Sequence, residues 1–185
     1  MRPFFFLWWL FLATFACPAF ANDEGPVKTT RSIWQLIYDH RSELDVEQIK
    51  NSLNKDFDAD FFAQKSLIKH WSSWSQAQKE EFKKEFMLML ARQLKPKLDK
   101  SDFGDRKAVF VLKSNGPQFS KVQAVTTYNK KPITILASLI KKNGQWLVYD
   151  VDVEDVNFII NYTSMFNKTI RLHGYNGLIE KLKRN

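Results

Sequence analysis

Three histidines, His40, His70 and His173, are the side chains best suited to transfer a proton or to bind a transition metal near neutral pH. They stand far apart in the sequence, and none belongs to an H-x-x-x-H, H-E-x-x-H or His/Cys pattern of the kind that holds zinc. The chain also lacks a G-x-S-x-G, a Walker and a G-x-G-x-x-G motif. The sequence therefore predicts no metal site, no cofactor and no catalytic residues, and we expect a protein that is not an enzyme.

A run of alternating aspartates, Asp56, Asp58 and Asp60, has the spacing that opens an EF-hand calcium loop. In such a loop the sixth position is glycine, which allows the sharp turn, and the twelfth is a bidentate glutamate. Here Phe61 and Leu67 occupy those two positions. The sequence therefore predicts no calcium site at this run.

Residues 1–21 have the pattern of a secretion signal. Arg2 supplies the positive charge, residues 4–13 form an uninterrupted apolar run, and residues 19–21 form an A-x-A cleavage site. The apolar run is shorter than the roughly 20 residues that a membrane-spanning helix needs. A lipoprotein cysteine at Cys17 is the alternative, but the residues before it lack the leucine of such a site. We expect cleavage after residue 21.

The mature chain, residues 22–185, has a length suited to one domain with a hydrophobic core of its own. Cleavage of the signal would remove the only cysteine, which excludes disulfides and thiol chemistry. The formal net charge is +8, and loss of Arg2 would leave +7. The positive charge is spread over many lysines, with no RNP, zinc-finger or helix-turn-helix pattern, so we expect no nucleic-acid partner.

Four strand-like runs follow one another in the second half of the chain. Only short turn segments separate them, and the last of these, Asn143-Gly144, is the strongest short hairpin signal. Because short turns cannot make parallel crossovers, the runs predict an antiparallel meander. The predicted strands are residues 107–113, 119–128, 133–142 and 145–153.

Helical spacing precedes these strands. After a polar leader at 22–28, apolar residues recur at helical spacing from Ser32, and Asp45 is suited to cap a second short helix. Ser75 and Gln78 form a capping box at the start of the clearest helix, which we expect to end at Pro96.

Helical spacing also follows the strands. Asp155 is suited to cap a helix whose apolar residues recur at steps of three or four, and Gly174 and Gly177 should break that helix before a short last one. The predicted fold is α+β: N-terminal helices, a twisted four-stranded antiparallel sheet like an NTF2-like cone, and C-terminal helices that close an apolar pocket.

The C-terminal third also carries a specific pattern. A strand with W-x-V-Y-D-V is followed by Y-x-x-x-F-x-x-x-I and then by G-x-x-G-L-I-x-x-L. The residues concerned are Trp146, Val148, Tyr149, Asp150, Val151, Tyr162, Phe166, Ile170, Gly174, Gly177, Leu178, Ile179 and Leu182. This pattern resembles the MlaC (toluene-tolerance auxiliary) family. Phe57-Asp58, Leu67 and Trp71 resemble a second motif of the family, in which Ile68 replaces the usual glycine.

The resemblance implies a soluble periplasmic phospholipid carrier. Such a protein shuttles lipid between outer- and inner-membrane complexes of an ABC-type lipid transport system and maintains outer-membrane lipid asymmetry. The expected partners are a diacyl phospholipid as cargo, an inner-membrane complex of permease, ATPase and MCE-domain protein, and an outer-membrane lipoprotein complex. We expect a monomer with no cofactor besides the cargo.

The cargo would lie among apolar side chains of the long helix, the strands and the C-terminal helix. The predicted lipid-binding residues are Phe82, Phe86, Met89, Leu90, Val109, Val111, Val125, Ile133, Ile135, Ala137, Leu139, Trp146, Val148, Ile159, Tyr162 and Phe166.

Two other functions fit the same predicted fold, because fold alone does not decide function. An NTF2-like enzyme or binder of a small hydrophobic ligand would need polar groups that converge in the cavity, and Tyr128, Ser138 and Asp150 are the candidates. A structural or adaptor domain would have a filled interior. The size and polarity of the cavity distinguish the three.

Overall fold

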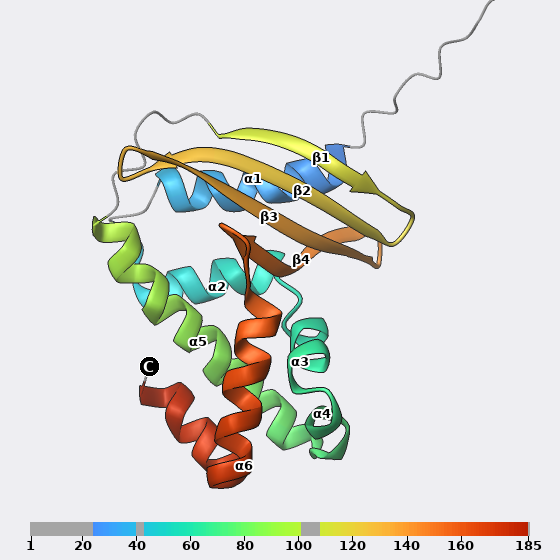
Figure 1. Cartoon of the computed structure of the whole chain (residues 1–185), viewed down its shortest axis with the longest axis vertical. Helices are drawn as coiled ribbons and strands as arrows, with labels where there is room; N and C mark the ends of the chain where they lie inside the picture. The colour runs from blue at the N-terminus through green and yellow to red at the C-terminus, as the bar shows by residue number, and fades with distance from the viewer. Residues whose placement is uncertain (1–23, 40–42, 101–107, 185) are drawn as a thin grey trace, which may run out of the picture.

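The computed structural model describes residues 24–39, 43–100 and 108–184. Within those residues the chain is α+β, with six helices and five strands (Figure 1). The helices are α1 (Glu24–Asp39), α2 (Val46–Asp56), α3 (Ala59–Leu67), α4 (Lys69–Ser73), α5 (Gln76–Lys100) and α6 (Phe158–Arg184). The strands are β1 (Val109–Asn115), β2 (Phe119–Tyr128), β3 (Lys131–Lys142), β4 (Gln145–Val153) and β5 (Val156–Asn157). The predicted signal segment, residues 1–21, lies outside the described residues.

The five strands form one antiparallel sheet in the order β1-β2-β3-β4-β5. Two-residue turns at Asn129-Lys130 and Asn143-Gly144 join the central strands, and all four residues have positive φ, as tight hairpin turns with the right twist require. The prediction of an antiparallel meander is therefore confirmed.

The prediction of four strands was wrong by one. β5 pairs with the end of β4 after a third tight turn at Glu154-Asp155, where φ is 50° and 64°. This turn contains no glycine or asparagine, so no sequence signal marks it. Asp155 therefore lies in a turn and does not cap α6. Asn157 takes that role, because its side-chain Oδ1 accepts a hydrogen bond from the Ile160 N–H at 2.8 Å.

Two helices differ from the predicted bounds. α1 begins at Glu24 rather than near Ser32, and Pro26 in its first turn is fully buried, a position where a helix tolerates proline. α5 continues through Pro96 to Lys100. The turn after the proline is held by Leu98, which is buried with Trp34 and Ile49 in one hydrophobic cluster.

Other helix boundaries follow the predicted signals. Asp45 and Gln48 form a capping box at α2, and Ser75 and Gln78 form one at α5. Gly174 breaks α6 with a φ of 64° and a ψ of −167°. Gly177 lies in the helical segment after the break, where a Cβ would come within 2.1 Å of the His173 Cβ.

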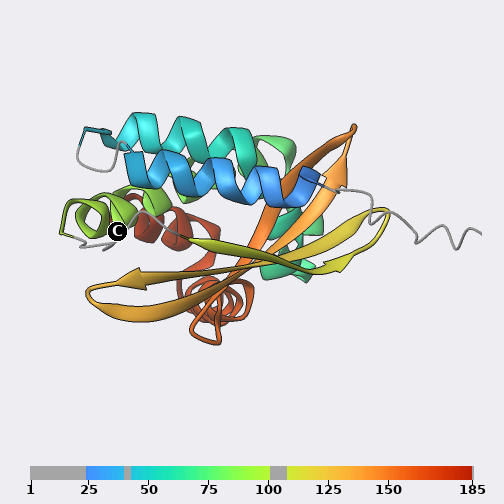
Figure 2. The ribbon, with the colours of Figure 1, turned by 90° about the horizontal axis from the view of Figure 1, so that it is seen from above.

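The helices form a layer on one side of the sheet and a bundle at one end of the molecule. α1 contacts β1, β2 and β4, and α2 contacts α5. Figure 2 shows α1 and α2 side by side on the same side of the sheet. The backbone N–H of Asp58 donates to the carbonyl of Val148 at 2.7 Å, which fixes the link between α2 and α3 to the central part of β4.

An aromatic core fills the bundle between α3, α5 and α6. The rings of Phe62 and Phe86 stack at 4.6 Å, Phe82 stacks on Phe86 at 5.7 Å, and Phe166 meets Phe82 edge-on at 5.3 Å. These four side chains are at most 1 % exposed. The core of the bundle is therefore tightly packed.

Candidate functional site: an apolar cavity between helices and sheet

A cavity of about 280 Å³ lies between the helical layer and the inner face of the sheet. Its walls come from α1, α2 and α5, from four strands, and from the first turns of α6. Twenty of its 26 lining residues are apolar or aromatic, which makes it suited to hydrocarbon rather than to a polar ligand. The lining residues are Thr30, Ile33, Trp34, Leu44, Ile49, Ser52, Leu53, Asp56, Phe57, Phe62, Phe86, Leu90, Gln93, Leu94, Lys97, Leu98, Phe110, Ala124, Ile135, Ala137, Val148, Asp150, Val151, Val153, Phe158 and Tyr162.

The strand register explains why space is left above the sheet. One row across the inner face joins Phe110, Ala124, Ile135 and Val153, and the next joins Val122 to Ala137. The two alanines are diagonal neighbours on adjacent strands, and each carries only a methyl group. A larger residue at either position would fill the volume that the cavity occupies.

The polar groups of the lining are few, and most have structural partners. The Thr30 hydroxyl donates to the Pro26 carbonyl at 2.9 Å, and the Tyr162 hydroxyl donates to Gln93 Oε1 at 3.2 Å. Burial raises the pKa of Tyr162 to about 12. The first contact lies within α1, whereas the second joins α6 to α5.

One carboxylate of the lining, Asp56, is the last residue of α2. Burial raises the pKa of Asp56 above its ordinary value, and the neighbouring Lys55 partly offsets this shift. The negative end of the helix dipole is also unfavourable for a carboxylate at this position. Asp56 therefore stabilises neither α2 nor the cavity when it is ionised.

Asp150 has a structural role. Its Oδ1 accepts hydrogen bonds from the backbone N–H groups of Val151 at 2.9 Å and Ile159 at 3.1 Å, and its Oδ2 accepts one from Asn157 Nδ2 at 2.7 Å. Burial raises the pKa of Asp150, and these hydrogen bonds lower it in part. The carboxylate therefore joins the end of β4 to the start of α6.

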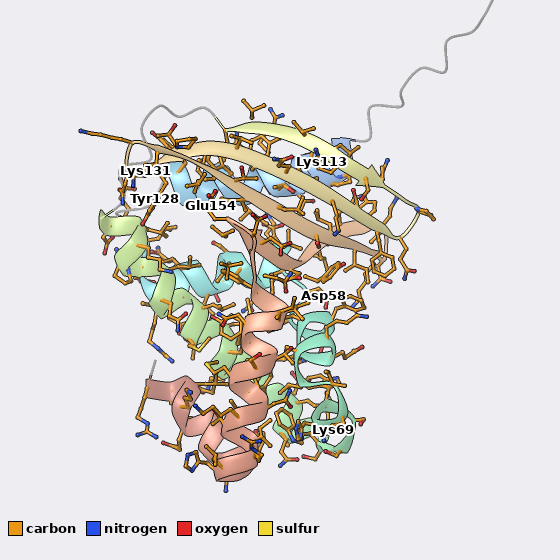
Figure 3. The ribbon with its side chains drawn as sticks, viewed as in Figure 1. Asp58, Lys69, Lys113, Tyr128, Lys131 and Glu154 are labelled. Atoms are coloured by element: carbon orange, nitrogen blue, oxygen red, sulfur yellow. The ribbon has the colours of Figure 1, made fainter. Side chains whose placement is uncertain are left out.

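The three polar candidates for a small-ligand site do not form one. Ser138 hydrogen-bonds to the Tyr149 hydroxyl, and burial raises the pKa of that phenol. Tyr128 ends β2 at the tip of the β2–β3 hairpin, where it pairs with Lys131 (Figure 3). Of the three, only Asp150 lines the cavity. These three side chains therefore do not converge on the cavity.

The structure brings six of the sixteen predicted lipid-binding residues together around the cavity. They are Phe86, Leu90, Ile135, Ala137, Val148 and Tyr162. The other ten lie elsewhere, and strand pairing and packing show where.

Four of these ten, Phe82, Met89, Ile159 and Phe166, belong to the packed core of the bundle. Leu139 and Trp146 lie on the inner face of the sheet, packed with residues of α1. Ile133 is in the inner-face row beyond Ile135, outside the cavity. Val109, Val111 and Val125 alternate with Phe110 and Ala124, so they lie on the opposite face, where Val109 is 61 % exposed.

Several lining residues were not predicted. The helical spacing of Ile33, Trp34, Ile49 and Leu53 marks a buried face but does not show that this face borders open space. Phe110 and Ala124 lie one residue away from predicted positions, on strands whose two faces are both partly apolar. A one-residue shift exchanges the faces of a strand.

The described part of the chain contains no group of three or more His, Cys, Asp or Glu side chains placed to hold a metal ion. None of its helices is long and apolar enough to cross a membrane.

The chain was compared with known proteins. A solved structure titled as a phospholipid-binding protein from Ralstonia solanacearum in complex with a phospholipid has the same fold, with a TM-score of 0.71 and 15 % identity over 86 % of this chain and 96 % of that one. No curated protein sequence matches. The family model described as "MlaC protein" matches residues 29–184. The resemblance seen in the sequence motifs is thereby confirmed, and the chain belongs to the MlaC protein family.

Proposed function

We propose that this protein binds a diacyl phospholipid with its acyl chains in the apolar cavity and its headgroup outside. It would act as a periplasmic carrier between outer- and inner-membrane complexes of an ABC-type lipid transport system, and so help to maintain outer-membrane lipid asymmetry. The observation that carries the proposal is the apolar cavity between α1, α2, α5 and the inner face of the sheet. Membership of the MlaC family and the phospholipid in the Ralstonia structure support it.

The energetics of lipid transfer account for an apolar interior. Burial of one methylene is worth about 0.8 kcal/mol, so two exposed acyl chains would cost on the order of 20 kcal/mol in water. A bilayer shields the chains equally well. The cavity therefore needs to match the bilayer, which keeps lipid exchange reversible, and the direction of transport would come from the partner complexes.

The cavity is small for two acyl chains. Its 280 Å³ lies just below the usual range of roughly 300–1,000 Å³ for small-ligand pockets. We therefore expect the helical layer to move away from the sheet when lipid enters. The alanine-lined inner face of the sheet would remain fixed, because β3 is held by strand pairing on both of its sides.

The experiment is to purify the protein without detergent, extract it with organic solvent and identify bound lipid by mass spectrometry. We expect phospholipid, and we expect delipidated protein to take up phospholipid from liposomes. Protein that yields no lipid and takes none up would contradict the proposal. A bound small hydrophobic metabolite in its place would favour a different ligand class.

A further inference from the structure

A second, separate groove lies between the α3–α4 corner and the outer surface of α6. It has a volume of about 670 Å³ and shares no lining residue with the apolar cavity. Lys69 borders it from α4, and Lys168 and Arg171 border it from α6. Figure 3 shows Lys69 at the helical end of the molecule, away from the sheet. None of the lining residues is buried, so the groove is a surface feature rather than an enclosed pocket.

The charge of this groove has one sign. Its lining contains three cations and no carboxylate. Among the described residues, the side chains of Lys69, Lys168 and Arg171 form no ion pair and no hydrogen bond. Lys83 differs, because it is held by Asp60 at 3.0 Å and Glu80 at 2.9 Å. The positive charge of the groove is therefore available to an external anionic surface.

The positive surface continues along α6. A neighbouring groove of about 490 Å³ shares Lys168 and adds Lys181 and Arg184, against one carboxylate, Glu180. Leu172 also lines it and is 58 % exposed. The cationic surface is thus extended and carries an exposed aliphatic side chain.

The exposure and backbone conformation of Ile68, which lines the first groove, are independent of the charge and also indicate an external partner. Its side chain is 61 % exposed, and its backbone has a φ of 46° and a ψ of −114°. A β-branched residue with positive φ is an outlier that strains the backbone. Neither burial nor backbone preference explains isoleucine at this corner, whereas contact with an apolar phase outside the protein would.

We propose that Ile68, Lys69, Lys168, Arg171 and Leu172 form a docking surface for an anionic phospholipid membrane. Cations beside exposed aliphatic side chains are the pattern of proteins that lie at a membrane interface: the cations bind acidic headgroups, and the aliphatic groups enter the boundary of the acyl region. An open surface without buried polar groups suits a fluid, sequence-neutral partner better than a protein segment in fixed register. This inference goes beyond the proposed carrier function, because it concerns a surface outside the cargo cavity.

The test is sedimentation with sucrose-loaded vesicles of 30 % phosphatidylglycerol in phosphatidylcholine, with pure phosphatidylcholine vesicles as reference. The protein should bind the anionic vesicles, and more weakly as salt rises. The triple variant Lys69→Gln, Lys168→Gln, Arg171→Gln should lower the partition coefficient roughly 100-fold, since each cation contributes about fivefold.

The matched control removes three exposed lysines from the sheet: Lys113→Gln, Lys121→Gln, Lys131→Gln. It has the same net charge as the first variant, so it should lower binding much less if the site is local. Ile68→Ala and Ile68→Gly should each lower partition about tenfold, because each removes the aliphatic group. Unchanged folding of the variants is checked by circular dichroism and melting temperature.

Three outcomes would overturn the inference: no binding to anionic vesicles, equal losses in the two triple variants, or full binding by both Ile68 variants. The first would favour an acidic protein partner for this surface. Bound lipid is measured by solvent extraction in every variant. If the Lys69/Lys168/Arg171 variant keeps its bound lipid but no longer sediments with the vesicles, the docking surface is supported. Absence of bound lipid in the wild-type protein would contradict only the carrier function.

Discussion

Asp150 Oδ1 accepts a hydrogen bond from the backbone N–H of Ile159 at 3.1 Å, so the end of β4 holds the first turn of α6. The same carboxylate also accepts hydrogen bonds from Val151 and Asn157. Because Phe158 and Tyr162 of this helix segment line the cavity, the carboxylate sets the position of one cavity wall.

Replacement of Asp150 should destabilise the fold. Asp150→Ala leaves the Ile159 N–H and the Asn157 amide without this acceptor, so the free energy of unfolding should fall by about 1–3 kcal/mol. Urea denaturation measures the change. Asp152→Ala is the control, since within the described residues the Asp152 side chain accepts only from Asn157, at 2.8 Å. Equal losses in the two variants would show that the Ile159 contact is not important.

A tryptophan at Ala137 should exclude the cargo. Ala137 is 4 % exposed and lines the cavity, so Ala137→Trp should fill the space for an acyl chain and destabilise the fold by about 1–3 kcal/mol through overpacking. Solvent extraction should then yield little phospholipid. Leu136→Trp lies next to it on the opposite face of β3 and should keep the lipid. Retention of lipid by Ala137→Trp would place the cargo elsewhere.

Asp56→Asn should stabilise the protein in a pH-dependent manner. The folded-state pKa of Asp56 is raised above its ordinary value of 3.8. The contribution of protonated Asp56 to the free energy of unfolding is therefore fully present below pH 3.8, and it is lost as pH rises through the folded-state pKa. At pH 7 the asparagine variant should have the higher free energy of unfolding, by a few tenths of a kcal/mol because the group is partly solvated, and therefore the higher melting temperature. Near pH 3 the two proteins should be equally stable. Asp60→Asn should show no such gain, because Asp60 pairs with Lys83.

Ile68→Gly should raise stability at the α3–α4 corner. Glycine adopts positive φ without steric strain, although its larger unfolded-state entropy offsets part of the gain, so the free energy of unfolding should rise by about 1 kcal/mol. Thermal denaturation measures it. Ile68→Ala retains a Cβ and should bring little of this gain. A glycine variant less stable than the wild type would mean that Ile68 makes a stabilising contact.

The mature protein should begin at Asn22. Intact mass of protein exported by a Gram-negative host measures this directly, and cleavage there removes Cys17. A mass that includes a lipidated Cys17 would contradict both the cleavage site and a freely diffusing carrier.

Local signals in the sequence predicted much of the fold. The Asn143-Gly144 turn fixed the β3–β4 hairpin, and the capping box at Ser75 marked the start of α5. β5 could not be predicted, because the Glu154-Asp155 turn adopts positive φ at both residues without the Asn-Gly or Asp-Gly pair that marks such turns. The length of α5 depends on the tertiary burial of Leu98, which overrides the local effect of proline.

The cavity was predicted less completely than the fold. In β3, the predicted residues Ile135 and Ala137 do line the cavity. In β1 and β2, the predicted residues Val109 and Val125 lie on the other face of the sheet. Both faces of these strands carry apolar residues, so alternation alone does not indicate which one turns inward. The open space itself results from the distance between α5 and the alanines of the sheet, which no local pattern encodes.

Each strand of the sheet pairs with the strand that follows it in the chain. β2, β3 and β4 are joined by two-residue turns, so their pairing closes only short loops and costs little chain entropy. The opposite wall of the cavity is built from α1, α2 and α5, which precede the sheet in the chain, and from α6, which follows it. We expect this wall to form late in folding and to loosen first in the native state, which gives a lipid chain a route into the protein while the sheet stays intact.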